Sequence, residues 1–115
     1  MTHLLDLRSR YLELTNRTLP QLAQQRRFAV SDNHCFQRII LDNLLGQCWY
    51  GVLERGKVPA YQQLTALQLQ QAIDLAEAII TQPNSYLEQL NQNSLNWRKK
   101  GRSSLPKPAE TAEKP

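Results

Sequence analysis

The sequence lacks the short motifs by which many enzymes and cofactor-binding proteins are recognised. Its four glycines stand apart from one another, so there is no glycine-rich loop that could cradle a phosphate. It has no Gly-x-Ser-x-Gly pattern for a nucleophilic serine, and no His-Glu-x-x-His or Cys-x-x-Cys pattern for a metal or redox site. We therefore predict no catalytic residue, no cofactor and no metal site, and we favour a non-catalytic protein.

Long apolar runs are absent too. No run approaches the roughly 20 residues that a helix needs to span a bilayer. The segment Met1–Arg8 carries a charge every few positions, which does not suit a secretion signal. Cys35 and Cys48 are the only cysteines, and both lie in apolar helical patterns, where a thiol packs as a small core residue. We expect a cytoplasmic protein that does not contact a membrane.

Strand signals are also missing, because no run alternates β-branched or aromatic residues with polar ones between turns. Helical spacing and helix caps are frequent instead. A chain of 115 residues has room for one domain. We predict an all-α fold, a small bundle of four or five helices over residues 1–100, with a disordered basic tail over residues 101–115.

Two helices are expected in the first quarter of the chain. Apolar residues at helical intervals predict an amphipathic helix over Thr2–Thr15; they are Leu4, Leu7, Tyr11 and Leu14. Thr18 then precedes Leu19-Pro20 and is suited to be the N-cap of a short helix over Leu19–Arg26, with proline in its first turn. The alternative is one long helix kinked at Pro20.

The central helix is expected to begin at a cap supplied by Ser31 or Asp32. We expect it to continue through Gly46, where it bends, to about Leu53. A loop over Glu54–Leu64 follows.

Two capping boxes predict the last two helices. Thr65–Gln68 opens one and Ser85–Glu88 opens the other, with Pro83 stopping the first of them. Beyond Lys100 the chain is rich in proline, serine and charge and holds one large apolar residue. Such a composition cannot bury enough surface to offset the entropy of ordering.

A polar stripe crosses the otherwise apolar central helix. His34, Arg38 and Asp42 follow one another at intervals of four and face nearly the same way. They could line a pocket, with Asp42 orienting Arg38 or accepting a proton while His34 titrates near neutrality. Alternatively, Arg38 and Asp42 form a structural ion pair and His34 lies on the surface. We favour the structural interpretation.

Aromatic residues are expected beside this stripe. Trp49 and Tyr50 are adjacent in sequence, so on a helix one packs inward and the other borders a groove. Tyr61 is expected to hold the following loop against the body. The candidate groove for a ligand or partner comprises His34, Arg38, Asp42, Trp49, Tyr50 and Tyr61.

The net charge of +4 comes from the end of the chain. Arg98–Pro115 holds six of the 14 basic residues but only two of the ten acidic ones, so the preceding body is neutral. A neutral body argues against a DNA-binding fold. A weak, sequence-independent nucleic-acid site remains an alternative, and its residues would be Trp97, Arg98, Lys99, Lys100 and Arg102.

Several segments resemble a family of small bacterial proteins of uncharacterised function. The matching segments are Asn33–Asp42, Trp49–Tyr50, Pro59–Leu64 and Leu90–Arg98. Proteins of similar sequence are sometimes labelled GCN5-related acetyltransferases. That label implies a mixed sheet and a glycine-containing loop for acetyl-CoA, and neither pattern is present here.

We therefore expect a helical protein that binds another protein, or a second copy of itself, through the groove near His34, Arg38, Asp42 and Trp49. Nucleic-acid binding is the second hypothesis. An enzyme, with the acyltransferase label as its only named form, is the third.

Overall fold

In the computed structural model, which describes residues 3–103 and their side chains up to Lys99, the chain is all-α, as the sequence predicts. The elements in chain order are α1 (Leu4–Glu13), the π-helical turn η1 (Leu14–Thr18), α2 (Leu19–Arg26), α3 (Asn33–Leu45), the 3-10 turns η2 (Trp49–Gly51) and η3 (Ala60–Gln63), α4 (Ala66–Thr81) and α5 (Asn84–Ser103). No helix of this part of the chain is long and apolar enough to cross a bilayer.

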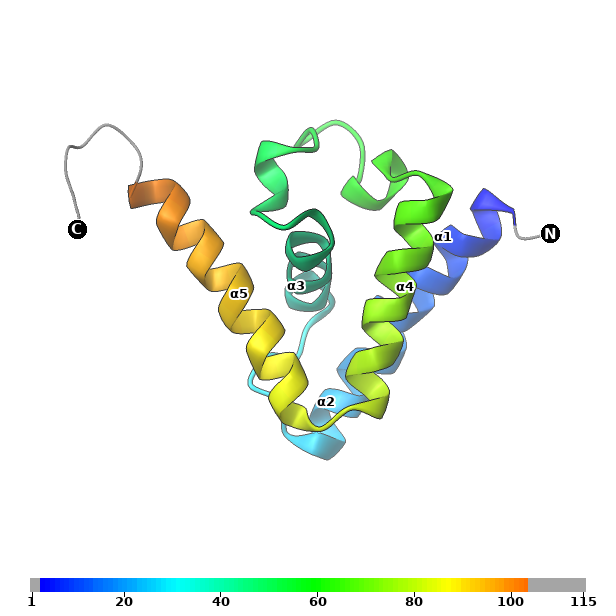
Figure 1. The fold of residues 1–115 in the computed structure, drawn as a ribbon. Helices are drawn as coiled ribbons and strands as arrows, with labels where there is room; N and C mark the ends of the chain where they lie inside the picture. The colour runs from blue at the N-terminus through cyan, green and yellow to red at the C-terminus, as the bar shows by residue number, and fades with distance from the viewer. Residues whose placement is uncertain (1–2, 104–115) are drawn as a thin grey trace.

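Helix α3 lies at the centre of the bundle. Figure 1 shows α4 and α5 diverging from a shared turn like the arms of a V, with α3 between them. Helix α1 packs along α4, and α5 packs along α3. The turns η2 and η3 lie at the open end of the V, with η2 on the side of α5 and η3 beside the beginning of α4 (Figure 1).

The core forms where the apolar stripes of these helices meet. Phe36, Ile39 and Ile40 of α3 are fully buried. They pack in one cluster with apolar side chains from α1, α2, α4 and α5, among them Tyr11, Leu19, Leu69, Ile79 and Leu87. Burying this much apolar surface is the main force that stabilises the bundle.

The first two expected helices are continuous, so the prediction of a break with an N-cap at Thr18 is wrong. Thr18 has helical backbone angles and its side chain caps nothing. The backbone N–H of Leu19 instead bonds to the carbonyl of Leu14, five residues back, which closes a π-helical turn. Helical structure therefore runs from Leu4 to Arg26, and Pro20 sits just after the wide turn, where its missing N–H costs little.

The π turn keeps apolar residues on one face of this long helix. Leu14 and Leu19 are five residues apart and both fully buried. In a regular α-helix a spacing of five would rotate Leu19 away from the face of Leu14. The extra residue accommodated in η1 restores the alignment for the core residues on either side, which are Leu7, Tyr11, Leu14, Leu19 and Ala23.

Deleting Arg17 should therefore be tolerated. Arg17 is exposed and makes only a long ion pair with Glu13 at 3.8 Å. Its removal converts the spacing of five into four, so a regular α-helix keeps the same buried face. We expect the free energy of unfolding to change by less than about 1 kcal/mol.

The matched control is deletion of Gln71, an exposed residue inside the regular helix α4. That deletion turns Ile73 and Ile79 away from the core and should prevent cooperative folding. Urea titration followed by circular dichroism distinguishes the two variants. Equal losses of stability would refute this account of the π turn.

The predicted continuation of the central helix to Leu53 is also wrong. Helix α3 ends at Leu45, because Gly46 takes the left-handed conformation (φ 73°) and serves as its carboxyl-terminal cap. The carbonyl of Asp42 accepts the N–H groups of Gly46 and Gln47 at 2.8 and 3.1 Å. A glycine at this position is a common stop signal, and it turns the chain towards η2.

Of the four helix caps expected from the sequence, those at Asp32 and Thr65 are present, whereas those at Thr18 and Ser85 are not. Asp32 caps α3 by accepting the N–H of Cys35 at 2.9 Å, and this bond lowers the pKa of its carboxyl. Thr65 and Gln68 form the expected capping box of α4. Helix α5 begins at Asn84, so Ser85 lies inside it and is not an N-cap.

The far end of α5 extends beyond the expected end of the domain. The helix continues through Ser103, three residues into the segment expected to be disordered. The remainder of that predicted tail, residues 104–115, lies outside the described residues.

Candidate binding site

The polar stripe of α3 is present, but its members are exposed to different degrees. His34 lies on the surface, Arg38 is half-buried, and Asp42 is fully buried. The expected ion pair between Arg38 and Asp42 does not form. The guanidinium of Arg38 instead reaches α5, where it donates to Ser94 Oγ at 2.8 Å and Asn91 Oδ1 at 2.9 Å.

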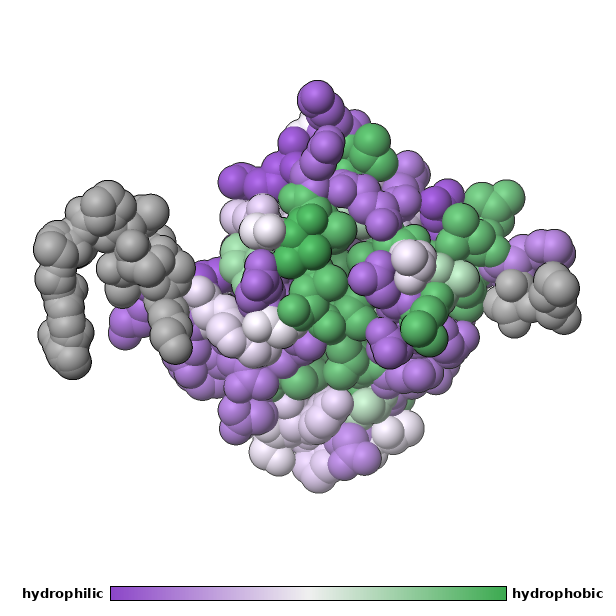
Figure 2. Space-filling model, turned by 45° about the horizontal axis from the view of Figure 1, so that its top comes forward, coloured by the Kyte–Doolittle hydropathy of each residue, from purple (hydrophilic) through white to green (hydrophobic). Residues whose placement is uncertain are grey.

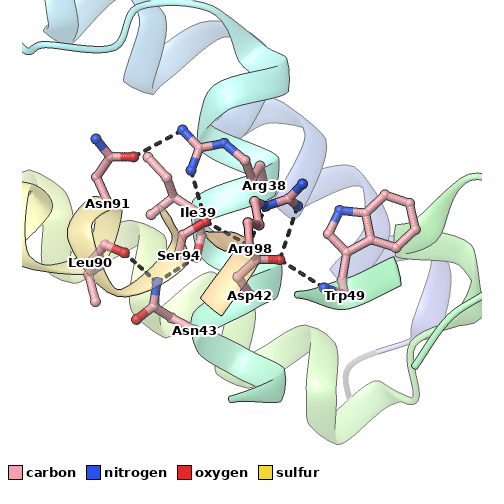
Figure 3. A network of polar contacts seen from close by, with 9 residues as sticks. All are labelled: Arg38, Ile39, Asp42, Asn43, Trp49, Leu90, Asn91, Ser94 and Arg98. Carbon is pink, nitrogen blue, oxygen red and sulfur yellow. Dashed lines mark hydrogen bonds and ion pairs between the residues drawn. The ribbon is translucent and has the colours of Figure 1, made fainter. Parts of the chain in front are cut away.

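Asp42 organises the contact between three segments. Figure 3 shows its carboxylate surrounded by donors from α5 and η2. It accepts the hydroxyl of Ser94 at 2.6 Å and the backbone N–H of Trp49 at 2.9 Å. Arg98 binds it through Nε at 2.8 Å and Nη2 at 3.3 Å. A fully buried carboxylate needs this set of partners, because an unpaired one would be costly to desolvate.

Two arginines are thus connected through one carboxylate. The hydroxyl of Ser94 accepts from Arg38 and donates to Asp42, which in turn pairs with Arg98. Burial alone would lower the pKa of the Arg98 guanidinium, but hydrogen bonds to Asp42 and Tyr50 and the charge of Asp42 outweigh it and raise that pKa. Arg98 is therefore charged, and a single carboxylate lies between the two guanidinium groups.

A second polar residue fixes α5 against α3. Asn43 donates to the carbonyls of Ile39 and Leu90 at 2.8 and 2.9 Å, and its own oxygen accepts from Asn93. Figure 3 shows Asn43 beside Asp42 at the same interface. These bonds set the rotation of α5 and hence the positions of Ser94 and Arg98.

One aromatic residue packs inward and its neighbour is exposed, as the sequence predicts, although both lie on a 3-10 turn and not on a helix. Trp49 is half-buried against the core, and Tyr50 is exposed. Their rings meet edge to face with centroids 4.8 Å apart. The guanidinium of Arg55 lies 3.7 Å and that of Arg98 4.6 Å from the centre of the Tyr50 ring, within the range of cation–π attraction.

Tyr61 joins the loop after η2 to the body. Its ring stacks on that of Tyr11 with centroids 6.0 Å apart and an angle of 27° between the planes. Tyr11 itself is fully buried, its hydroxyl has no partner among the described residues, and burial raises its pKa. The loop is therefore held by ring packing on α1.

These segments enclose an open pocket of about 420 Å³. Its wall comes from α3, η2, η3 and α5, and includes His34, Arg38, Trp49, Tyr50, Tyr61 and Arg98. Five of the six groove residues expected from the sequence thus line one pocket, and Asp42 lies beneath its wall, where it holds Trp49 and Arg98. The size is typical of small-ligand sites or of pockets for one or two side chains.

The catalytic interpretation of the stripe has little support from this geometry. Asp42 has no exposed surface, and its oxygens accept bonds from Ser94, Trp49 and Arg98, so it is poorly placed to take a proton from a substrate. Cys35 and Cys48 are both half-buried, and Cys35 lines the pocket. The expectation that both thiols lie in the core is therefore wrong. Within residues 3–103, no cluster of three metal-ligating side chains is found.

The described residues of the nucleic-acid hypothesis differ in their exposure and in their partners. Trp97 is half-buried, and the charge of Arg98 is neutralised by Asp42. Lys99 is exposed. The side chains of Lys100 and Arg102 lie outside the described part of the chain. Arg98 is therefore not free to bind a phosphate. Nucleic-acid binding through the other residues stays a prediction.

Sequence reasoning missed Asn91 and Ser94 as parts of the site. With Arg98 they follow one another at intervals of three and four, so they form a polar stripe along one face of α5. The stripe of α3 has intervals of four and four, so each helix carries a polar stripe along one face. Two such stripes could have predicted that the helices pack with these faces together. A scan of protein-family models and searches of the curated proteins and the solved structures each found no match to this chain.

Proposed function

We propose that this chain is a non-catalytic interaction protein that binds a partner protein through the pocket between α3, η2, η3 and α5. The observation that carries the proposal is the pocket itself, which brings aromatic and cationic side chains from four segments to one concave surface. Aromatic residues and arginine are the side chains enriched at the centres of protein interfaces.

The pocket wall is held in place before any partner arrives. The N–H of Trp49 is fixed by Asp42, Arg38 is fixed by Ser94 and Asn91, and Tyr61 is packed against α1. A wall that is already ordered loses little conformational entropy on binding, which favours affinity.

Apolar surface next to the pocket supports a protein partner over a small molecule. Val52 and Val58, on the segment between η2 and η3, are 49% and 42% exposed. Figure 2, which views the molecule tilted towards this end, shows apolar residues gathered in the middle of the face and bordered by hydrophilic ones. An exposed apolar patch that is bordered by polar residues is typical of an interaction site.

Selection from a library of random 12-residue peptides tests the proposal. A variant with His34→Trp fills the mouth of the pocket, because His34 is an exposed wall residue on α3. The matched control is Gln71→Trp, at an exposed helical position outside the pocket wall. We expect peptides to be enriched on the unaltered chain and on the Gln71→Trp variant, but not on the His34→Trp variant.

Equal enrichment on the three proteins would place binding elsewhere, and no enrichment on any of them would argue against a peptide-binding function. Circular dichroism of the two variants shows that each retains its helical fold. A second copy of the chain as partner would appear as association at rising concentration in sedimentation, and the His34→Trp variant should then remain monomeric.

A further inference from the structure

We infer that the partner presents a carboxylate to this pocket, as an acidic peptide segment in which an Asp or Glu stands next to an apolar residue. The inference rests on the proposed function and specifies the chemistry of the same site. The peptide's single negative charge pairs with Arg38, and the apolar residue next to it packs against the aromatic wall of the pocket.

The charge balance of the pocket wall favours an anion at Arg38. Asp42 neutralises Arg98 by a two-bond ion pair. Arg38 is half-buried and bonds only to the neutral side chains of Ser94 and Asn91, and it makes no ion pair with any residue that the structure describes. A partly buried guanidinium without a counter-ion gains most from an incoming anion, since its own desolvation is already partly complete.

Arg38 also has hydrogen-bond donors that no described residue uses. A guanidinium carries five N–H donors in a planar fork. The bonds to Ser94 and Asn91 use one donor on each terminal nitrogen. The remaining donors belong to a side chain that lines the pocket. A carboxylate is the group whose two oxygens match such a fork.

An acidic residue at the pocket favours a carboxylate over a doubly charged phosphate. Asp32 also lines the pocket, and hydrogen bonding to Cys35 lowers the pKa of its carboxyl, so this group is charged at neutral pH. It lies exposed at the amino-terminal end of α3, where it would repel a dianion more strongly than a monoanion. One uncompensated cation beside one rim carboxylate favours a single negative charge.

The apolar neighbour follows from the rest of the wall. Leu41, Trp49 and Tyr61 face the same pocket as Arg38. A segment such as Glu-Phe or Asp-Leu would place its carboxylate at Arg38 and its apolar side chain against these residues. Isolated anions lack the second contact and should bind much more weakly.

Peptides that the unaltered chain selects from the random 12-residue library provide the test. We expect them to share an Asp or Glu beside an apolar residue. Replacing that acid by its amide should weaken binding to the unaltered chain by about tenfold or more, as expected for a charged hydrogen-bonded pair. On an Arg38→Gln variant the acid and amide peptides should bind equally well. An Arg10→Gln variant, which alters an exposed arginine of α1 outside the pocket wall, should behave like the unaltered chain.

A measurement on the unaltered chain avoids dependence on the folding of the variants. Binding of the acidic peptide, followed by calorimetry, should weaken with added salt more steeply than binding of its amide counterpart. Selected peptides without a shared acid, or acid and amide forms that bind the unaltered chain equally, would overturn the inference and leave the proposed function standing. If no peptide is selected through the pocket, the proposed function fails and this inference fails with it.

Discussion

Replacing Asp42 with alanine is expected to lower the free energy of unfolding by about 3 kcal/mol. The carboxylate is fully buried and accepts bonds from Ser94, Arg98 and the backbone of Trp49. Without it, the partly buried charge of Arg98 and two further donors lose their acceptor. Loss of one partner of a buried pair costs about 3–5 kcal/mol, and the exposure of 20% that Arg98 retains places the value at the lower end.

The control is Asp74→Ala on α4, where an exposed carboxylate accepts one bond from Gln70. This change should alter stability by less than about 0.5 kcal/mol. Urea denaturation followed by circular dichroism measures both variants. A similar small effect for Asp42→Ala would show that the network does not stabilise the junction of α3, α5 and η2.

A double-mutant cycle identifies the partner of Asp42. Asp42 and Arg98 share an ion pair, whereas Asp42 and Arg38 are connected only through Ser94. The coupling energy of the first pair should therefore exceed that of the second. A larger coupling energy between Asp42 and Arg38 would support the ion pair within α3 that the sequence suggests.

The second large effect is expected at Arg26, whose side chain closes the end of the V. Its guanidinium donates to the carbonyls of Ile80 and Gln82 at 2.9 and 2.7 Å and to Asn84 Oδ1 at 2.7 Å, and it lies 5.1 Å from the centre of the Phe28 ring. It thereby satisfies carbonyls left open at the end of α4 and fixes the turn to α5. The three bonds need a planar fork, so Arg26→Lys should lower stability by about 2 kcal/mol although it keeps the charge.

The neighbouring residue supplies the control. Arg27 is exposed, so Arg27→Lys should leave the midpoint of urea denaturation nearly unchanged. Arg27 adopts a positive φ of 57°. Arginine and lysine are equally disfavoured in this conformation, so the control substitution leaves the backbone strain unchanged. Equal effects of the two substitutions would mean that Arg26 contributes through its charge alone.

The helix caps that were predicted from the sequence and are present in the structure depend on local contacts. The bond that Cys35 N–H donates to Asp32 and the capping box of Thr65 and Gln68 join residues three apart, so a single stretch of sequence contains all the atoms that form them. Gly46 shows how a local signal can be misjudged, because the apolar residues beyond it suggested a longer helix. Its left-handed conformation ended α3 and freed the following residues to form η2.

The π turn could not be inferred in the same way. A spacing of five between Leu14 and Leu19 fits either a break or a wide turn, and the choice depends on whether both residues face the same core. Helices α3 and α4 supply that core, so tertiary packing determines whether the chain forms a break or a π turn.

The sequence by itself determined that this protein is helical, roughly where most of its helices lie, and that polar and aromatic residues gather around the central one. Only the tertiary structure decided that Asp42 pairs with Arg98 and that Arg38 turns to Ser94. Spacing of four on one helix permits a pair between Arg38 and Asp42, but a pair on a helix surface gains little energy. Packing α5 against α3 buried the carboxylate and offered it stronger partners 52 and 56 residues away. Burial makes the choice of partner energetically important, and burial is a property of the assembled bundle.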